Sequence, residues 1–358
     1  MFLKKGVFIV FGISMLLAVP VRAAEAPPET SARAMIVYHA ASGRVLAAKN
    51  PDEPMLVAST TKLMTALVAA EQGDLDRDVE ILPQWTLAEG SSMYLRSGER
   101  YTLRELLQGL LLASGNDAAL AVAETVGGSV ERFAERMNRT AGELGLSHTH
   151  FSNPHGLDGE DHFSCARDLA VLMGRVMTEP ELREILGMRT ACIHGTLYLN
   201  HNKLLGRCEG VVGGKTGYTK AAGRCLVSCC RRDGLELICV TLSDPEDWTD
   251  HRALYDWAFS RYRAMDPGEL DPLPAIPRIG AEEPAGVDWG AAPELCVARD
   301  ARISAEIRLP RFVFRPVVPG TEAGKIRIAE NEKTIAEFPL VWGGNRTDPT
   351  GFVGSMAI

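Results

Sequence analysis

Ala58-Ser59-Thr60-Thr61-Lys62-Leu63-Met64-Thr65-Ala66-Leu67 is the stretch on which the fold and the chemistry of this chain depend. It follows the loop-like Asp52-Glu53-Pro54 and continues as an apolar run, which predicts a largely buried helix. Ser59 is of a residue type that often caps helices, so the helix is expected to start there. Lys62 stands three positions after Ser59, which places a hydroxyl and an amine one turn apart on one side of the helix. Such a pair can act as nucleophile and base beside the positive helix N-terminus.

Composition limits the classes of protein to which the chain can belong. Its 358 residues are 46% hydrophobic, enough for one large domain and a smaller one. The net charge of −8 and the lack of a long basic run argue against sequence-independent nucleic-acid binding. Of the eight cysteines, several fall in apolar strand-like runs and none forms a Cys-x-x-Cys pair. We therefore expect mostly free thiols and no structural zinc site.

The first residues have the pattern of an export signal. A short basic segment, Met1–Lys5, precedes the apolar run Gly6–Val19. Val21-Arg22-Ala23 then fits the small-x-small cleavage rule, so residues 1–23 are predicted to be a signal peptide. The apolar run is short for a membrane-spanning helix, and no later segment is long enough for one.

Hydrophobic periodicity predicts an α+β domain. Strands are expected at 34–39, 45–48, 225–230 and 235–240, and helices from 59 and at 103–112, 117–126, 130–144, 166–177 and 250–263. Arg231-Arg232-Asp233-Gly234 is a strong hairpin signal. Because the strands lie at both ends and the helices between them, the chain ends are expected to share one antiparallel sheet.

A second, smaller domain is expected after this one. The large domain is predicted at 24–265, followed at 266–293 by a Pro- and Gly-rich linker and the start of the second domain. Alternating patterns at 302–309, 325–328 and 334–338 predict a small β-rich domain over 294–346. The tail, 347–358, contains Pro349 and Gly351 and has too little apolar sequence for an interfacial helix, so membrane attachment stays open.

Two further short motifs accompany the Ser59–Lys62 pair. Ser114-Gly115-Asn116 lies on a tight connection between two predicted buried helices, and Lys215-Thr216-Gly217 opens the strand-rich end. Loops held by rigid elements commonly present side chains to a cleft. The loop 147–163 also holds four of the eight histidines, His148, His150, His155 and His162. No carboxylate or cysteine stands at matching spacing, so these histidines are interpreted as solvated or hydrogen-bonded loop residues rather than metal ligands.

The three motifs, in this order, resemble those of penicillin-recognising serine enzymes. More closely, the chain resembles the low-molecular-mass penicillin-binding proteins that act as D-alanyl-D-alanine carboxypeptidases. The wider stretches Leu110–Ala119, Phe151–Leu157 and Gly214–Thr219 support the resemblance, which covers about residues 30 to 260 well. It implies a transpeptidase-like antiparallel sheet flanked by helices, an extracytoplasmic location and no cofactor. It also implies a peptidoglycan stem peptide ending in D-Ala-D-Ala as substrate and β-lactams as inhibitors that acylate Ser59.

The chemistry of such an acyl transfer assigns the motif residues to roles. Ser59 suits the nucleophile and Lys62 its base, for which the lysine pKa must fall by roughly 3, at a cost of about 4 kcal/mol. Ser114 suits a proton relay, and Asn116 suits orienting Lys62 or the substrate amide. We expect Lys215 and Thr216 to bind the terminal carboxylate, and Gly217 to let substrate approach the strand edge. The resemblance implies an oxyanion hole made by the backbone N–H groups of Ser59 and Tyr218.

Enzymes with related chemistry are the nearest alternatives. A class A β-lactamase needs a further glutamate to activate the deacylating water, and no Glu-x-x-Leu-Asn stretch stands between the second and third motifs. A D,D-transpeptidase or endopeptidase differs only in its acceptor or substrate and stays open.

Two alternatives come from other classes. A non-catalytic cell-wall binding or sensing protein could retain the same scaffold, although the intact motif set argues against it. A nucleotide-binding loop is suggested by Gly210–Thr216. It would require a glycine where Glu209 stands, and a helix where a strand is predicted.

Overall fold

The computed structural model describes residues 26–71, 74–270, 272–314 and 316–343. The expected signal peptide of residues 1–23 and the tail of residues 347–358 lie outside the described residues. Within the described part of the chain, no helix is both long enough and apolar enough to cross a membrane.

A five-stranded antiparallel sheet forms the centre of the larger part of the molecule, in the order β2-β1-β9-β8-β7. Its strands are β1 (Ala34–His39), β2 (Arg44–Lys49), β7 (Val211–Thr219), β8 (Gly223–Arg232) and β9 (Leu235–Leu242). Because β1 pairs with β9, the prediction that both ends of this region share one antiparallel sheet is confirmed. The edge strand β7 carries the Lys215-Thr216-Gly217 motif.

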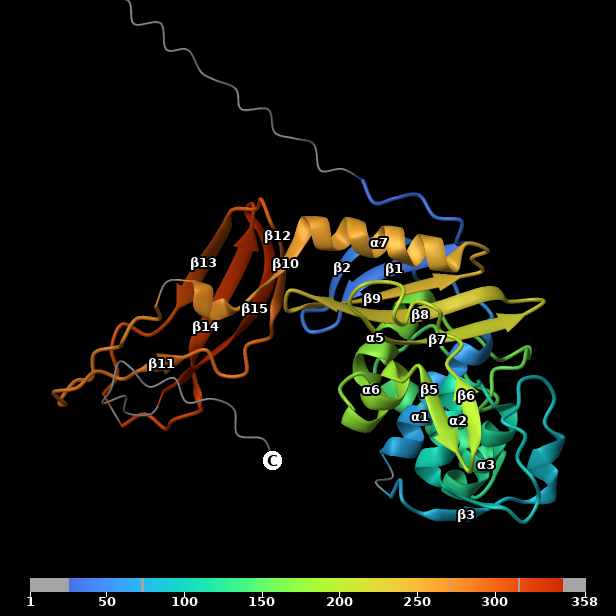
Figure 1. Cartoon of the computed structure of the whole chain (residues 1–358). Helices are drawn as coiled ribbons and strands as arrows, with labels where there is room; N and C mark the ends of the chain where they lie inside the picture. Colours follow the sequence, from blue (N-terminus) through green and yellow to red (C-terminus); the bar gives the residue numbers. More distant parts are fainter. Residues whose placement is uncertain (1–25, 72–73, 271, 315, 344–358) are drawn as a thin grey trace, which may run out of the picture.

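Helices cover both faces of this sheet (Figure 1), with α7 on one face and the remaining helices on the other. They are α1 (Lys62–Ala70), α2 (Leu103–Leu112), α3 (Asn116–Gly127), α4 (Val130–Glu143), α5 (Ala166–Val176), α6 (Pro180–Gly187) and α7 (Asp247–Arg261). The alternation of side chains along β8 produces this arrangement. Cys225 and Val227 join the core beneath the main helical block, whereas Leu226 and Cys230 join the core beneath α7.

Several short elements were not predicted from the sequence. They are β3 (Asp78–Glu80), β4 (Arg100–Thr102), β5 (Thr190–Ile193), β6 (Thr196–Leu199), the helix α6, and the 3₁₀ turns η1 (Ala58–Thr61), η2 (Pro83–Leu87) and η3 (Pro267–Glu269). Most are too short to show a period. The start of α2 has a local signal, because Thr102 and Glu105 form a reciprocal capping box.

A second antiparallel sheet, ordered β11-β15-β14-β13, contains the predicted C-terminal strands. The strands of this part are β10 (Tyr262–Met265), β11 (Val287–Asp288), β12 (Leu295–Ala298), β13 (Ile303–Arg308), β14 (Glu322–Glu330) and β15 (Lys333–Trp342). Strand β10 pairs with β12, so backbone hydrogen bonds join the two sides of the Pro- and Gly-rich segment 266–293. Figure 1 shows this part of the molecule beside the end of α7.

Arg44 links the β1–β2 hairpin to the C-terminal strands. Its guanidinium donates to the Cys296 carbonyl at 2.6 Å and to both carboxylate oxygens of Glu330, at 3.1 and 2.6 Å. It also lies over the Tyr262 ring, 5.2 Å from the centroid. The backbone N–H of Ala298 donates to the same Glu330 carboxylate at 2.6 Å. The side chains of Arg44 and Glu330 are 21% and 13% exposed, so solvent screens this pair weakly.

We expect the Arg44→Met substitution to lower the free energy of unfolding by about 3 kcal/mol, because it leaves the Glu330 carboxylate poorly paired. Urea unfolding followed by tryptophan fluorescence measures the loss. In the Arg44→Met/Glu330→Met double variant, part of this loss should be recovered, because neither charge then remains. A loss below about 0.5 kcal/mol in the single variant would show that the ion pair is dispensable.

All eight cysteines carry free thiols, and seven of them are buried.

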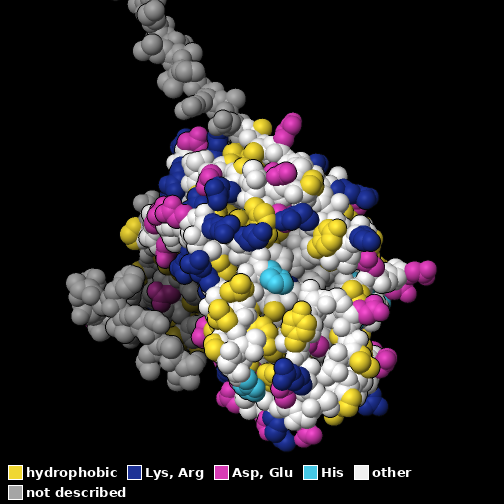
Figure 2. All heavy atoms as spheres, turned by 45° about the vertical axis from the view of Figure 1, so that its right-hand side comes forward, with side chains coloured by type: hydrophobic (Ala, Val, Ile, Leu, Met, Phe, Trp, Pro, Cys, Tyr) yellow, Lys and Arg dark blue, Asp and Glu magenta, His cyan; other side chains and the backbone are white. Residues whose placement is uncertain are grey.

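Figure 2 shows that Lys and Arg side chains gather in a band across one face, next to hydrophobic side chains, although the formal net charge is −8. The acidic and basic groups are therefore unevenly distributed over the surface.

Candidate active site

Ser59 lies in the 3₁₀ turn η1 and does not cap the helix that follows. Helix α1 begins at Lys62, and no side chain caps its N-terminus. The prediction that Ser59 is the N-cap is therefore wrong. The hydroxyls of Thr60 and Thr61 donate to the carbonyls of Val57 and Ala58, at 2.7 and 2.8 Å, and so favour a tighter turn. This arrangement leaves the Ser59 hydroxyl available to a side chain.

The amine of Lys62 contacts three oxygen atoms. Its Nζ lies 2.9 Å from Ser59 Oγ, 2.7 Å from Asn116 Oδ1 and 2.6 Å from the His155 carbonyl. The Asn116 amide nitrogen donates to the Glu89 carbonyl at 2.6 Å, which fixes its oxygen toward Lys62. Asn116 Oδ1 and the His155 carbonyl can only accept hydrogen bonds, whereas the Ser59 hydroxyl can also donate. A neutral Lys62, with two hydrogens and one lone pair, therefore fits these three partners.

Burial and charge favour this neutral state. The Lys62 side chain is fully buried, and burial lowers its pKa well below the ordinary lysine value. The positive charge of Lys215 lowers the Lys62 pKa further, against a smaller opposing effect of Asp117. Burial also lowers the pKa of Lys215, to about 7. Two buried amines near each other disfavour a second positive charge.

Ser114 connects the second and third motifs. Lys215 Nζ donates to Ser114 Oγ at 3.0 Å and to the Thr216 carbonyl at 2.8 Å. Ser114 stands between α2 and α3 with a φ of 61°, in the left-handed region that non-glycine residues rarely occupy. Ala58, next to Ser59, has a φ of 46°. Strained residues of this kind cluster at functional sites, where the surrounding structure holds them.

Two glycines allow the backbone to close around Ser59. A Cβ at Gly217 would lie 2.9 Å from the Val57 carbonyl oxygen and 3.1 Å from the Ser59 nitrogen. Gly156 has a φ of 88°, and a Cβ there would lie 2.0 Å from the Ala58 carbonyl oxygen. Thr65 Oγ1 also donates to the Pro154 carbonyl at 2.6 Å, which anchors the 153–157 loop on α1. These contacts explain how the stretch Phe151–Leu157 brings the His155 carbonyl to Lys62.

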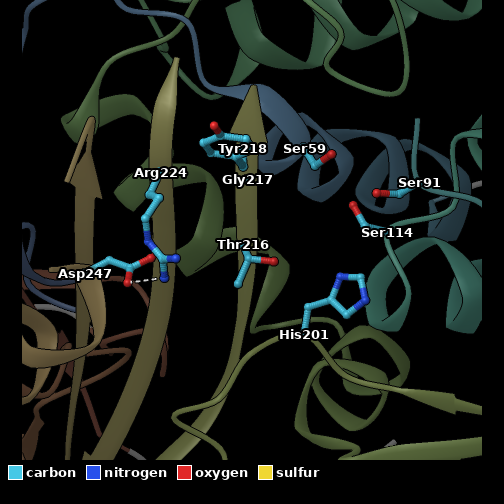
Figure 3. Close-up of a pocket in the computed structure, with 9 residues that line it drawn as sticks. All are labelled: Ser59, Ser91, Ser114, His201, Thr216, Gly217, Tyr218, Arg224 and Asp247. Atoms are coloured by element: carbon cyan, nitrogen blue, oxygen red, sulfur yellow. Dashed lines mark hydrogen bonds and ion pairs between the residues drawn. The ribbon is translucent and has the colours of Figure 1, made fainter. Parts of the chain in front are cut away.

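A cavity of about 530 Å³ opens beside Ser59 (Figure 3). It is lined by Ser59, Ser91, Ser114, His201, Thr216, Gly217, Tyr218, Arg224 and Asp247. Five of these residues were predicted from the motifs: Ser59, Ser114, Thr216, Gly217 and Tyr218. The other three predicted residues, Lys62, Asn116 and Lys215, are buried and contact the residues that line it.

A sequence model of the D-alanyl-D-alanine carboxypeptidase family, peptidase family S11, matches residues 21–246. The chain belongs to this family. It is 29% identical to D-alanyl-D-alanine carboxypeptidase DacF of Bacillus subtilis over 327 residues, 86% of this chain and 84% of the relative. It is 31% identical to D-alanyl-D-alanine carboxypeptidase DacC of Escherichia coli over 353 residues, 92% of this chain and 87% of the relative.

A solved structure supports the same assignment. The chain is similar to penicillin binding protein 5 from Haemophilus influenzae, with a TM-score of 0.78 and 27% identity. The match covers 89% of this chain and 98% of that one. The resemblance noted in the sequence is thus confirmed, as is the α+β fold it implied.

In this member of the carboxypeptidase family, Asp117 organises a loop that sequence analysis did not connect to the site. The Asp117 carboxylate is buried and accepts hydrogen bonds from Ser92 Oγ (2.6 Å) and from the backbone nitrogens of Met93 (3.0 Å) and Leu95 (3.1 Å). The backbone N–H of Asn116, its neighbour in sequence, donates to the Ser91 carbonyl at 2.7 Å. Asp117 therefore holds the loop that places Ser91 in the cavity.

We expect Asp117→Ala to lower the free energy of unfolding by about 3 kcal/mol, because two buried backbone N–H groups lose their acceptor. Urea unfolding measures this change. Asp76→Ala is a matched control, since Asp76 is exposed and its side chain makes only a surface ion pair with Arg104. An equal loss in both variants would contradict the assigned role of Asp117.

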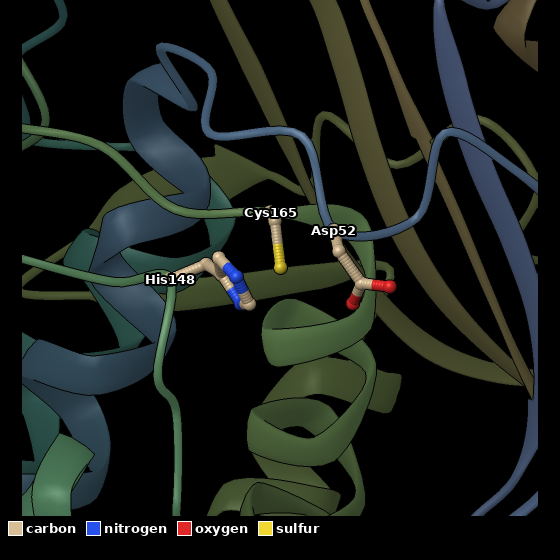
Figure 4. A group of neighbouring side chains, drawn as sticks. All are labelled: Asp52, His148 and Cys165. Atoms are coloured by element: carbon tan, nitrogen blue, oxygen red, sulfur yellow. The ribbon is translucent and has the colours of Figure 1, made fainter.

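The loop histidines of this family member differ in their surroundings. His162 is buried, its Nε2 lies 2.8 Å from Thr61 Oγ1, and burial lowers its pKa to about 4. The fold also brings Asp52 and Cys165 next to His148, with possible ligand atoms within 4.8 Å of one another (Figure 4). The sequence spacing gave no sign of this cluster, because its members are distant in the chain.

The Asp52–His148–Cys165 cluster has other partners. Arg167 donates to both oxygens of the Asp52 carboxylate, at 2.6 and 3.1 Å. Burial raises the pKa of the Cys165 thiol to about 12, and its sulfur accepts from the Asp168 backbone N–H at 3.4 Å. Arg167 thus occupies the Asp52 carboxylate and a backbone N–H occupies the Cys165 sulfur, so these contacts favour a structural role for the cluster.

Proposed function

We propose that this chain is a serine D-alanyl-D-alanine carboxypeptidase that removes the terminal D-alanine from peptidoglycan stem peptides. The observation that carries the proposal is the set of three contacts around Lys62, which suits a neutral amine beside the Ser59 hydroxyl. This pairing supplies an activated nucleophile without any group from outside the chain.

Acylation follows from these positions. Lys62 Nζ takes the proton of Ser59 Oγ as the oxygen attacks the carbonyl carbon of the penultimate D-alanine. The bond to the terminal D-alanine nitrogen then breaks, leaving an ester on Ser59. The leaving amine needs a proton, which in our proposal the Ser114 hydroxyl delivers while Lys215 holds its oxygen. Ser114 takes up in exchange the proton that Lys62 removed from Ser59, so Lys62 is neutral again when acylation ends. In our proposal the backbone N–H groups of Ser59 and Tyr218 stabilise the developing oxyanion.

Deacylation reverses the roles. A water molecule gives a proton to Lys62 and attacks the ester carbonyl, which releases the shortened peptide and returns the proton to Ser59 Oγ. A β-lactam enters the same sequence, since opening its amide ring leaves an acyl group on Ser59. Removal of terminal D-alanine would withdraw donors from crosslinking and so limit it.

Substrate binding is assigned to the edge of β7. Thr216 and Gly217 line the cavity beside Ser59, and Tyr218 is 65% exposed at its rim. Asn116 orients Lys62. Lys215 is buried and its Nζ donates to the Thr216 carbonyl at 2.8 Å, so we propose that it contributes positive potential behind Thr216 rather than a direct contact to the substrate. The peptide would lie along β7, whose outer edge no strand covers among the described residues.

Location and domain division belong to the same proposal. A peptidoglycan substrate requires an extracytoplasmic enzyme, which is consistent with the expected signal peptide of residues 1–23. We assign catalysis to residues 24–265 and leave open the role of the predicted β-rich domain, residues 294–346. The tail lies outside the described residues, so attachment to the membrane is left open.

The test is release of D-alanine from diacetyl-L-Lys-D-Ala-D-Ala by the purified protein, together with the intact mass after exposure to benzylpenicillin. We expect catalytic release and one stable penicilloyl adduct per chain. Rapid loss of the adduct without D-alanine release would instead indicate a β-lactamase. Transfer of the acyl group to an added amine, without hydrolysis, would indicate a transpeptidase. No reaction with either compound would indicate a binding or sensing protein.

A further inference from the structure

Three exposed arginines gather next to the cavity without an acidic partner. Arg189, Arg207 and Arg252 are all exposed, and a guanidinium is positively charged at any physiological pH. Within the described residue ranges, none of the three forms an ion pair with an aspartate or a glutamate, whereas the nearby Arg232 pairs with Asp256 at 2.9 Å. We call these three residues the arginine cluster. Its charge is not neutralised by the part of the chain that the structure describes.

Contacts through one short loop bring the arginine cluster together. A Cβ at Gly206 would lie 3.2 Å from the guanidinium carbon of Arg189, so this guanidinium packs against the loop. Arg252 Nη2 donates to the Arg207 carbonyl at 3.1 Å. The backbone N–H of Arg207 donates to the Leu204 carbonyl at 3.0 Å, which folds the loop into a tight turn. The three charges are therefore held close to one another by a single turn.

The segments that carry the arginine cluster also reach the cavity. The backbone N–H of Asn200 donates to the Arg189 carbonyl at 2.9 Å, and the next residue, His201, lines the cavity. Arg252 lies on α7, whose first residue, Asp247, lines the cavity as well. A ligand bound by the arginine cluster would therefore be held beside the substrate site.

The arginine cluster opposes the overall charge of the chain. The formal net charge is −8, yet a band of Lys and Arg side chains crosses one face of the molecule (Figure 2). A single exposed ion pair contributes little in water. Several pairs made by one polyanion reinforce one another, because after the first pair has formed the others form within the same complex. The arginine cluster therefore suits a polymer with repeated negative charges better than a small anion.

We infer that the arginine cluster binds polymeric peptidoglycan, through carboxylates of stem peptides that neighbour the one in the cavity. The inference rests on the proposed carboxypeptidase function and names glycan strands with several stems as the preferred form of the substrate. Each uncleaved stem ends in a carboxylate, which a guanidinium can bind through two parallel hydrogen bonds. The reaction at Ser59 is unchanged. The arginine cluster raises the concentration of stems near the cavity.

Two substrates with the same scissile bond test this inference. They are soluble peptidoglycan strands with pentapeptide stems, and the disaccharide-pentapeptide monomer that muramidase releases from those strands. Release of D-alanine per stem gives kcat/KM at about 20 mM and about 500 mM NaCl. At low salt we expect kcat/KM to be about 10-fold higher on strands than on the monomer. At high salt the preference should fall below about twofold, because salt screens exposed charges.

Arg207→Glu/Arg252→Glu should remove the preference for strands at low salt and change kcat/KM on the monomer by less than about twofold. Arg302→Glu/Lys325→Glu is the matched control. Arg302 directly precedes β13 and Lys325 lies on β14, and both are exposed, so the same change in net charge is made on the second sheet. This control should retain the preference. The circular dichroism of both variants should match that of the unmodified protein.

Cosedimentation provides a readout that does not need turnover. The unmodified protein and the control should pellet with insoluble peptidoglycan at low salt, and Arg207→Glu/Arg252→Glu should remain in the supernatant. Binding to vesicles of anionic phospholipid but not to peptidoglycan would identify a membrane as the partner and overturn the inference.

The failures of the inference and of the proposed function are distinguishable. Equal kcat/KM on strands and monomer in the unmodified protein, or a preference that Arg207→Glu/Arg252→Glu retains, would overturn the inference and leave the proposed function intact. An equal loss of preference in Arg302→Glu/Lys325→Glu would assign the effect to net charge and not to the arginine cluster. If the unmodified protein releases D-alanine from neither substrate, the proposed function is wrong and the inference fails with it.

Discussion

Ser59→Ala is expected to lower D-alanine release by about 10⁴-fold or more, because the variant lacks the oxygen that we propose forms the acyl intermediate. The penicilloyl adduct should disappear from the intact mass spectrum at the same time. Ser59 is half-buried and its side chain contacts the Lys62 amine, so its replacement removes one hydrogen bond and little packing. The variant should therefore remain folded.

Two measurements make the Ser59 result decisive. Ser260→Ala, at an exposed position on α7, should keep full activity and full acylation. Circular dichroism of Ser59→Ala should match that of the unmodified protein. If a penicilloyl adduct still forms on Ser59→Ala, the nucleophile is another residue, and the serines that share the cavity, Ser91 and Ser114, become the candidates.

Lys62→Met is expected to lower kcat/KM by about 10²- to 10⁴-fold, the usual contribution of a positioned base. Methionine fills a similar volume but leaves Asn116 Oδ1 and the His155 carbonyl without their donor.

The effect of pH on activity follows from the direction of the Lys62 pKa shift. Lys62 must be neutral to accept the proton, and it is protonated below its lowered pKa. Activity of the unmodified protein should therefore rise with pH through this pKa, and the rise should be absent in the variant.

The pH profile of kcat/KM between about pH 5 and pH 10 tests the assignment of Lys62. Lys203→Met is the control, since Lys203 is exposed and should leave both rate and profile unchanged. An acidic limb that persists unchanged in Lys62→Met would assign the base to a different group. Lys215 would then be the first candidate, because burial places its pKa at about 7.

Most of the fold could be predicted because its elements have strong local patterns. The leucines of 103–112 recur at helix spacing, and α2 has those same bounds. The hairpin signal at 231–234 joins β8 and β9 as expected. The short hairpin β5–β6 was missed because four-residue strands with mostly exposed side chains carry no burial period.

The candidate site was predicted as a set of motifs but not as a geometry. Order and spacing along the chain pointed to Ser59, Lys62 and Ser114. They could not show that the His155 carbonyl completes the environment of Lys62, because a backbone group has no sequence signature. Nor could they show that β8 and α7 place Arg224 and Asp247 in the cavity, since this depends on register between strands. The N-cap prediction for Ser59 failed because the neighbouring threonines stabilise a 3₁₀ turn.

The pairing of β1 with β9 determines when this chain can fold. Val37 of β1 lies opposite Cys239 of β9. The first strand of the sheet in sequence therefore pairs with its last strand. The Ser59 turn and the strand bearing Lys215 are likewise far apart in the chain and touch across the cavity. Contacts this distant in sequence make folding slow, because closing the long loops costs conformational entropy before the strands can pair. Ser59, the proposed nucleophile, therefore lies far from the strand that completes its surroundings along the chain, and the cavity cannot form before β7 has packed beside the Ser59 turn.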